Sequence, residues 1–148
     1  MPEPAILLDT HCWIWMQFGQ VEHFSRAIRA ALVRSAQMGG MCVSVISVWE
    51  VGMLEAKGRL ELKMSCAEWV KQAVATPGLS LYPLTPEIAI ESSRLPGRFH
   101  GDPADRILVA TARMTGARLL TKDERLLEYG RQRHAAVLRP SQRGQPPA

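Results

Sequence analysis

The chain has 148 residues, which suits one domain, and its 47% hydrophobic and 22% charged residues exclude intrinsic disorder over most of the length. The formal net charge is +4, and the surplus is uneven: ten basic and five acidic residues lie from Arg98 onward, against eight and nine before it. A basic C-terminal third is typical of a protein that binds a polyanion such as nucleic acid, and a solvated basic surface explains it equally well.

The first part of the chain alternates between strand and helix patterns. The continuous apolar run 5–8 predicts a buried parallel strand. Apolar residues then recur at helical spacing over 24–32, and Gly39-Gly40 is a typical end for that helix. Residues 41–45 predict a second strand, and a helix opened by Ser47 is expected to run to about residue 57.

The middle of the chain carries two further helix starts around one strand. Ser65 is expected to cap a helix, with Glu68 completing a Ser-x-x-Glu capping box. After Pro77-Gly78, residues 79–82 predict a third strand. Thr85-Pro86 then starts a helix, because proline is favoured at the first helical position.

The C-terminal third repeats the alternation. Asp102-Pro103 predicts the start of a helix that Gly116 ends. Residues 117–120 predict a fourth strand, 123–129 a short helix, and 135–138 a fifth strand of weaker signal.

Strands that alternate with helices predict an α/β fold, with a central parallel sheet of four to five strands covered by helices on both faces. We assign residues 1–138 to this three-layer domain and 139–148 to a flexible, basic, proline-rich tail. Cys12, Cys42 and Cys66 are far apart, which argues against a disulfide framework and a structural zinc site. The N-terminus is a poor signal peptide and no apolar run of about 18 residues exists, so we expect a reduced, cytoplasmic protein with no membrane partner.

Acidic residues follow the predicted strands. Ligands of open parallel sheets bind beyond the carboxyl ends of the strands, so the acids are expected to meet at one edge. Each also has a local explanation, because each lies at a helix start, where acids act as caps or complement the helix dipole. Gathered carboxylates repel one another unless a cation lies among them, and hard oxygen ligands favour Mg²⁺ or Mn²⁺ over zinc. The acids are Asp9, Glu50, Asp105 and Asp123.

Four segments carry these acids: Leu7–Trp15 (LLDTHCWIW), Ser47–Gly52 (SVWEVG), Gly101–Ala112 (GDPADRILVATA) and Leu119–Asp123 (LLTKD). In order and spacing they resemble the motifs of PIN-domain ribonucleases, and within that superfamily the VapC-type toxins of bacterial toxin–antitoxin pairs. Each motif alone is weak, but the four together match over about 5–138, nearly the whole chain.

The resemblance implies a PIN-like fold and a metal-dependent endoribonuclease that is neutralised by a cognate antitoxin and is generally a homodimer. One or two Mg²⁺ or Mn²⁺ ions would activate a water for attack on the RNA phosphate, so no protein nucleophile is required. Matched motif by motif, the catalytic and metal-binding acids are Asp9, Glu50, Asp105 and Asp123, with Asp102 as an extra metal-binding acid and Thr10 and Thr121 as supporting polar residues.

Basic and aromatic residues near the motifs have open assignments. Arg106, beside Asp105, is a candidate for contact with RNA or, as the alternative, for an ion pair with a carboxylate. The tryptophans fit core packing or a protein interface better than base stacking. The candidate contacts to RNA phosphates are Arg98, Arg106, Arg113, Arg118 and Arg125, and the tryptophans are Trp13, Trp15, Trp49 and Trp69.

Other functional classes fit less well. A phosphotransfer domain of the haloacid-dehalogenase type requires a second aspartate two residues after Asp9, where His11 stands. A dinucleotide-binding protein requires a glycine-rich turn after the first strand, which this chain lacks. A PIN-like module that binds RNA or protein without catalysis stays open, because a sequence does not show turnover.

Overall fold

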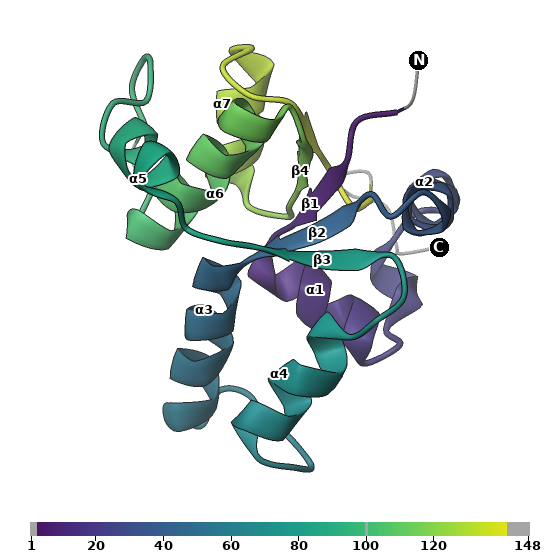
Figure 1. Cartoon of the computed structure of the whole chain (residues 1–148). Helices are drawn as coiled ribbons and strands as arrows, with labels where there is room; N and C mark the ends of the chain where they lie inside the picture. The colour runs from purple at the N-terminus through teal and green to yellow at the C-terminus, as the bar shows by residue number, and fades with distance from the viewer. Residues whose placement is uncertain (1–2, 100, 142–148) are drawn as a thin grey trace.

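The computed structural model describes residues 3–99 and 101–141. In these residues five strands form one parallel sheet in the order β3-β2-β1-β4-β5, with β1 at the centre (Figure 1). The predicted parallel sheet is therefore confirmed, with the fifth strand included. The strands are β1 Ile6–Leu8, β2 Met41–Ser44, β3 Leu79–Tyr82, β4 Arg118–Leu120 and β5 Val137–Leu138.

Helices cover both faces of the sheet. In Figure 1, α1, α3 and α4 lie below the sheet, whereas α5, α6 and α7 lie above it. The α-helices are α1 Thr10–Gln17, α2 Arg26–Gln37, α3 Val45–Ala56, α4 Cys66–Val74, α5 Pro86–Ser92, α6 Pro103–Thr115 and α7 Glu124–Arg131; a short 3-10 helix spans Val21–His23. Among the described residues, no helix is long and apolar enough to cross a membrane.

The central strand β1 supplies side chains to two cores. Ile6 and Leu8 belong to one core, built with side chains of α1, α2, α3 and α4. Leu7 points to the opposite face and belongs to a second core with side chains of α6 and α7. Since all three are fully buried, the strand is apolar along its whole length, as expected of a parallel strand covered on both faces.

The start of α3 differs from the prediction. The helix begins at Val45 with Ser44 as its N-cap, whose Oγ accepts a hydrogen bond from Ile46 N at 3.0 Å. Ser47 is fully buried inside the helix, so the predicted start at Ser47 is wrong. The β-branched residues around the junction extend the strand pattern into the first helical turn, because the strand passes into the helix without a loop.

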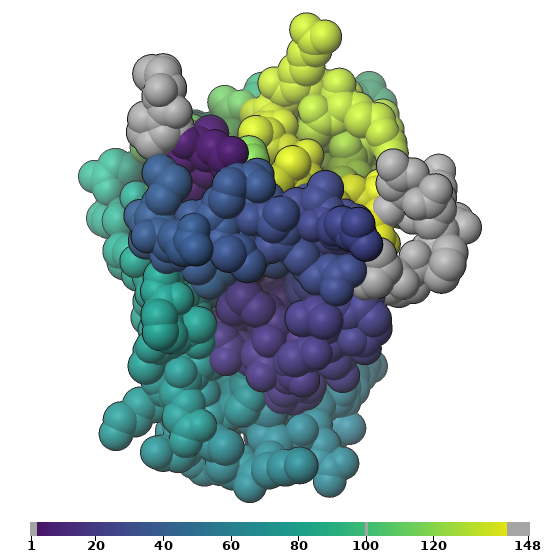
Figure 2. Space-filling view, turned by 90° about the vertical axis from the view of Figure 1, so that its right-hand side faces the viewer, coloured from purple at the N-terminus to yellow at the C-terminus, as the bar shows by residue number. Residues whose placement is uncertain are grey.

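The end of the described chain packs against the domain. The carbonyl of Pro140 accepts a hydrogen bond from Ser25 N at 2.8 Å, at the start of α2. Arg139 pairs with Glu124 in α7 at 2.7 Å. Figure 2 shows the yellow C-terminal residues beside the blue residues of α2. Of the tail expected from residue 139, these two residues are thus part of the domain surface, and 142–148 lie outside the described residues.

Candidate functional site

The carboxyl edge of the sheet carries a cavity of about 430 Å³ that five acidic side chains line. They come from the residues after β1 and β4, from the second turn of α3 and from the start of α6, segments far apart in the sequence. The structure thus brings together every acid expected from the sequence, and all four aspartates of the chain are among them. The acids are Asp9, Glu50, Asp102, Asp105 and Asp123.

Asp9 is the N-cap of α1 and the most enclosed of these acids, at 7% exposure. Its Oδ1 accepts a hydrogen bond from Cys12 N at 3.0 Å. Its Oδ2 accepts one from the hydroxyl of Thr121, which is fully buried at the end of β4. The Thr121 Oγ1 also accepts a bond from Asp123 N at 3.1 Å, so this threonine links the first acid to the fourth.

Glu50 is held by a second hydroxyl. The Thr10 hydroxyl donates to Glu50 Oε1 at 2.5 Å and is hydrogen-bonded to the Ser47 hydroxyl at 2.9 Å. Thr10 and Ser47 are buried, and Ser47 lies one helical turn before Glu50 in α3. A helix start at Ser47, as predicted from the sequence, does not imply this contact. The spacing of three residues between Ser47 and Glu50 was the available signal, because residues three apart share a helix face.

Helix capping and membership of the site are compatible roles for the aspartates. Asp102 caps α6 by accepting from Asp105 N at 2.8 Å, and Asp123 caps α7 by accepting from Arg125 N at 2.8 Å. Each of these caps, like that of Asp9, uses Oδ1. The positive ends of three helix dipoles therefore face the cavity and partly offset the carboxylate charges.

The clustered charges change the acid–base properties of two side chains. Burial, and then repulsion from Asp102, Asp123 and Glu50, raises the pKa of Asp105 to about 7. Burial also raises the pKa of Glu50, against the opposing effect of the Thr10 hydrogen bond. Since each shift reflects a penalty on the ionised form, a cation bound in the cavity would relieve both.

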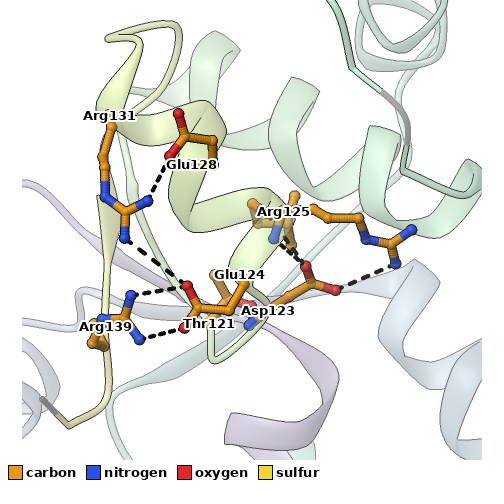
Figure 3. Close-up of polar contacts among 8 residues, drawn as sticks. Thr121, Asp123, Glu124, Arg125, Glu128, Arg131 and Arg139 are labelled. Atoms are coloured by element: carbon orange, nitrogen blue, oxygen red, sulfur yellow. Dashed lines mark hydrogen bonds and ion pairs between the residues drawn. The ribbon is translucent and has the colours of Figure 1, made fainter. Parts of the chain in front are cut away.

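Among the described residues, Arg125 is the arginine that lines this cavity. Its Nη2 lies 3.6 Å from Asp123 Oδ2 and 4.0 Å from Asp105 Oδ2, with the guanidinium turned toward Asp123 in Figure 3. The Arg125 side chain remains 64% exposed, so solvent screens its attraction to these acids. Arg125 therefore lies at the cavity and pairs with site carboxylates. The sequence had suggested such a pairing for Arg106 instead.

The other arginines proposed as RNA contacts lie outside the acidic cavity. Arg106 donates to the carbonyls of Ser92 and Phe99 at 3.1 and 3.0 Å, so its suggested pairing with a site carboxylate is wrong. Arg113 pairs with Glu91 at 2.7 Å, and Arg118 donates to the carbonyl of Pro4 and lies near Glu3. Arg98 lines a neighbouring cavity of about 400 Å³ that shares Glu124 and Arg125 with the acidic one.

The tryptophans divide between core and surface. Trp13 is fully buried and packs edge-on against Trp69, with ring centroids 5.2 Å apart. Both are core residues, as the sequence favoured. Trp49, by contrast, is 56% exposed on α3, next in sequence to Glu50.

The donor set of the cavity fits a divalent cation, because carboxylate oxygens suit Mg²⁺ and Mn²⁺ and because, after burial, repulsion from neighbouring acids helps to raise the pKa of Asp105. Within residues 3–99 and 101–141, however, no three His, Cys, Asp or Glu side chains are placed so that they hold one metal ion as they stand. Metal binding at these acids therefore requires some of their side chains to rotate toward a common point.

The Thr121 hydroxyl should contribute to the stability of the fold as well as to the site. We expect Thr121→Val to lower the free energy of unfolding by about 1–3 kcal/mol, because Asp9 Oδ2 and Asp123 N lose a buried partner. Chemical denaturation measures this change. Thr121→Ser is the matched control, since it keeps the hydroxyl, and an equal loss in both variants would show that the hydroxyl is unimportant.

Comparison with known proteins identifies relatives. A family model described as the PIN domain matches residues 6–132. Over 136 residues the chain is 33% identical to Ribonuclease VapC22 of Mycobacterium tuberculosis. The matched region covers 90% of this chain and 98% of that protein.

Solved structures with a similar fold include VapBC2 from Rickettsia felis bound to a DNA fragment from its promoter. The match has a TM-score of 0.67 and 12% identity, and it covers 93% of this chain and 99% of that one. DNA-bound VapBC from Salmonella typhimurium matches with a TM-score of 0.65 and 17% identity, over 94% and 100% of the two chains. At these identities the solved structures support the fold.

Proposed function

The chain belongs to the PIN-domain family, and on this premise we propose that it is a metal-dependent endoribonuclease of the VapC type that acts as the toxin of a toxin–antitoxin pair. The observation that carries the proposal is the convergence of five acids in one cavity at the carboxyl edge of the sheet. A protein that only binds RNA has no need to gather five mutually repelling carboxylates there. The identity to a named ribonuclease over nearly the full length of both chains gives independent support.

In this proposal Asp9, Glu50, Asp105 and Asp123 hold one or two Mg²⁺ or Mn²⁺ ions, with Asp102 as a further ligand. A bound ion would lower the pKa of a water and stabilise negative charge at the scissile phosphate. The ion count and identity are part of the proposal.

The chain's own hydroxyls orient the ligands. The Thr121 hydroxyl and Cys12 N donate to the two oxygens of Asp9, which restricts rotation of this carboxylate. The Thr10 hydroxyl likewise donates to Oε1 of Glu50. Such partners pre-organise a site, because the rotation of each ligand is restricted before the substrate binds.

Partners follow from the relatives. Two chains of similar fold are solved as VapBC complexes, which supports our proposal of a cognate antitoxin. We extend the proposal to a homodimer, to RNA as the substrate and to the cytoplasm as the compartment, where free cysteines such as Cys12, Cys42 and Cys66 stay reduced. The exposed Trp49 offers apolar surface for protein contacts.

Metal-dependent RNA cleavage tests the proposal. The protein, purified free of any co-expressed partner, should cleave structured RNA when Mn²⁺ or Mg²⁺ is added and should stop when EDTA is added. Mapping of cleavage sites on total RNA measures the reaction. RNA binding without cleavage under any metal condition would support the alternative, a non-catalytic PIN-like module, and would refute the enzyme.

A further inference from the structure

Lys122 is a basic residue at the acidic cavity, between Thr121 and Asp123 in the sequence. It lines the cavity together with the five acids and with Arg125. Arg125 approaches two of the acids, as described above. In the described part of the chain, by contrast, no carboxylate oxygen lies within the 4.0 Å of an ion pair from the Lys122 ammonium. Its charge is therefore not neutralised by a neighbour.

An aromatic ring holds this ammonium instead. The Nζ of Lys122 lies 5.2 Å from the ring centroid of Trp15 in α1. The same ring stacks on His23 at 3.9 Å with an interplanar angle of 8° and meets the buried Phe24 edge-on at 6.0 Å. A ring fixed by two neighbours is a rigid support. The contact orients the lysine without cancelling its charge, because the ring carries only a quadrupole.

The backbone at Lys122 is also fixed. Thr121 N donates to the carbonyl of Leu138 at 3.1 Å, and Asp123 N donates to Thr121 Oγ1 at 3.1 Å. Lys122 therefore lies between two residues that are tied to the site, one of which binds Asp9 directly. A displacement of the Lys122 backbone would also displace Asp123 and the hydroxyl that binds Asp9. The Lys122 backbone therefore keeps a fixed position relative to these two carboxylates.

We propose that Lys122 binds a phosphate of the RNA strand at the mouth of the cavity and thereby positions the scissile phosphate over the carboxylates. This inference rests on the proposed ribonuclease function. The five acids repel a polyanion, and a cation that is charged, oriented and unpaired at the cavity mouth offsets that repulsion where the strand enters. If Lys122 leaves the Trp15 ring to bind a phosphate oxygen, no carboxylate loses an ion-pair partner. If Arg125 binds the phosphate instead, Asp105 and Asp123 lose a nearby positive charge.

RNA binding by a cleavage-deficient protein tests the proposal. In an Asp9→Asn background, the affinity for a labelled single-stranded oligouridylate is measured by fluorescence anisotropy at several salt concentrations. We expect Lys122→Gln to weaken binding about 5–10-fold. The slope of log K against log salt should fall by about 0.7–1, because one phosphate contact is lost. Lys122→Arg should restore both values.

Lys63→Gln is the matched control, because Lys63 is exposed, outside the helices and strands, and absent from the cavity lining. A second test addresses Trp15: Trp15→Leu should weaken binding when Lys122 is present and have no further effect in Lys122→Gln. If the wild type cleaves RNA but Lys122→Gln binds like Lys63→Gln, this inference is refuted and the proposed function stands. If wild-type protein does not cleave RNA and the Asp9→Asn protein does not bind it, both are refuted.

Discussion

Asp9→Asn is expected to lower RNA cleavage by about 100-fold or more while the protein stays folded. Asparagine has nearly the same shape, and its side-chain oxygen is able to keep the α1 cap by accepting from Cys12 N. What is lost is the negative charge at the most enclosed carboxylate of the cavity, which the proposed metal site requires. Cleavage of structured RNA in saturating Mn²⁺ measures the loss, and thermal unfolding measures the fold.

The control for this substitution is Glu61→Gln, which removes one carboxylate charge from an exposed position outside the helices and strands. Since every aspartate of the chain lines the cavity, a glutamate is the nearest equivalent. Glu61→Gln should cleave RNA at the wild-type rate. Cleavage by Asp9→Asn at a rate within a few-fold of wild type would remove Asp9 from the proposed metal site.

Asp105→Asn is expected to stabilise the metal-free protein at pH 8 and to have little effect near pH 4. In the folded protein the pKa of Asp105 is raised from an ordinary value of 3.8 to about 7, first by burial and then by repulsion from Asp102. The unfolded chain releases this proton near pH 4 and the folded one near pH 7. The folded state is therefore penalised as pH rises through this window, and the penalty is complete above it.

Asparagine removes this penalty, so the free energy of unfolding in EDTA at pH 8 should rise by about 1–2 kcal/mol after allowance for solvent screening. Urea denaturation at the two pH values measures the difference. Added Mg²⁺ should reverse the order at pH 8, because an ion that binds only the folded state stabilises the wild type more than the variant. A variant less stable than wild type at pH 8 in EDTA would show that ionisation of Asp105 carries no penalty in the folded state.

Local contacts explain why many elements were predictable from the sequence. The expected caps at Ser65, Thr85 and Asp102 are all confirmed, each by acceptance of a hydrogen bond from the backbone N–H three residues later. Such a contact depends on a few neighbouring residues and is therefore encoded in a short segment. The predicted start of α3 was wrong because β-branched residues on both sides of Ser44 give the strand and the first helical turn the same pattern.

The cavity was predictable in its acids and not in its supporting contacts. Convergence of the acids follows from the parallel strands, because each acid lies just beyond a strand or within the first two turns of a following helix. The hydroxyl of Thr121 and the carboxylate of Asp9 are 112 residues apart, and Thr10 and Glu50 are 40 apart. No local pattern predicts these pairs, since strand register decides which side chains meet.

The sequence by itself therefore determined the alternation of strands and helices, the family, and the identity of the acids that meet at one edge. Only the tertiary structure decided which basic side chains accompany them: Arg125 rather than Arg106 beside the carboxylates, and Lys122 on the ring of Trp15. The physical reason is the length of these side chains. Backbone hydrogen bonds fix where a helix starts, whereas a long cationic side chain has several rotamers and selects its partner among residues that only folding brings within reach.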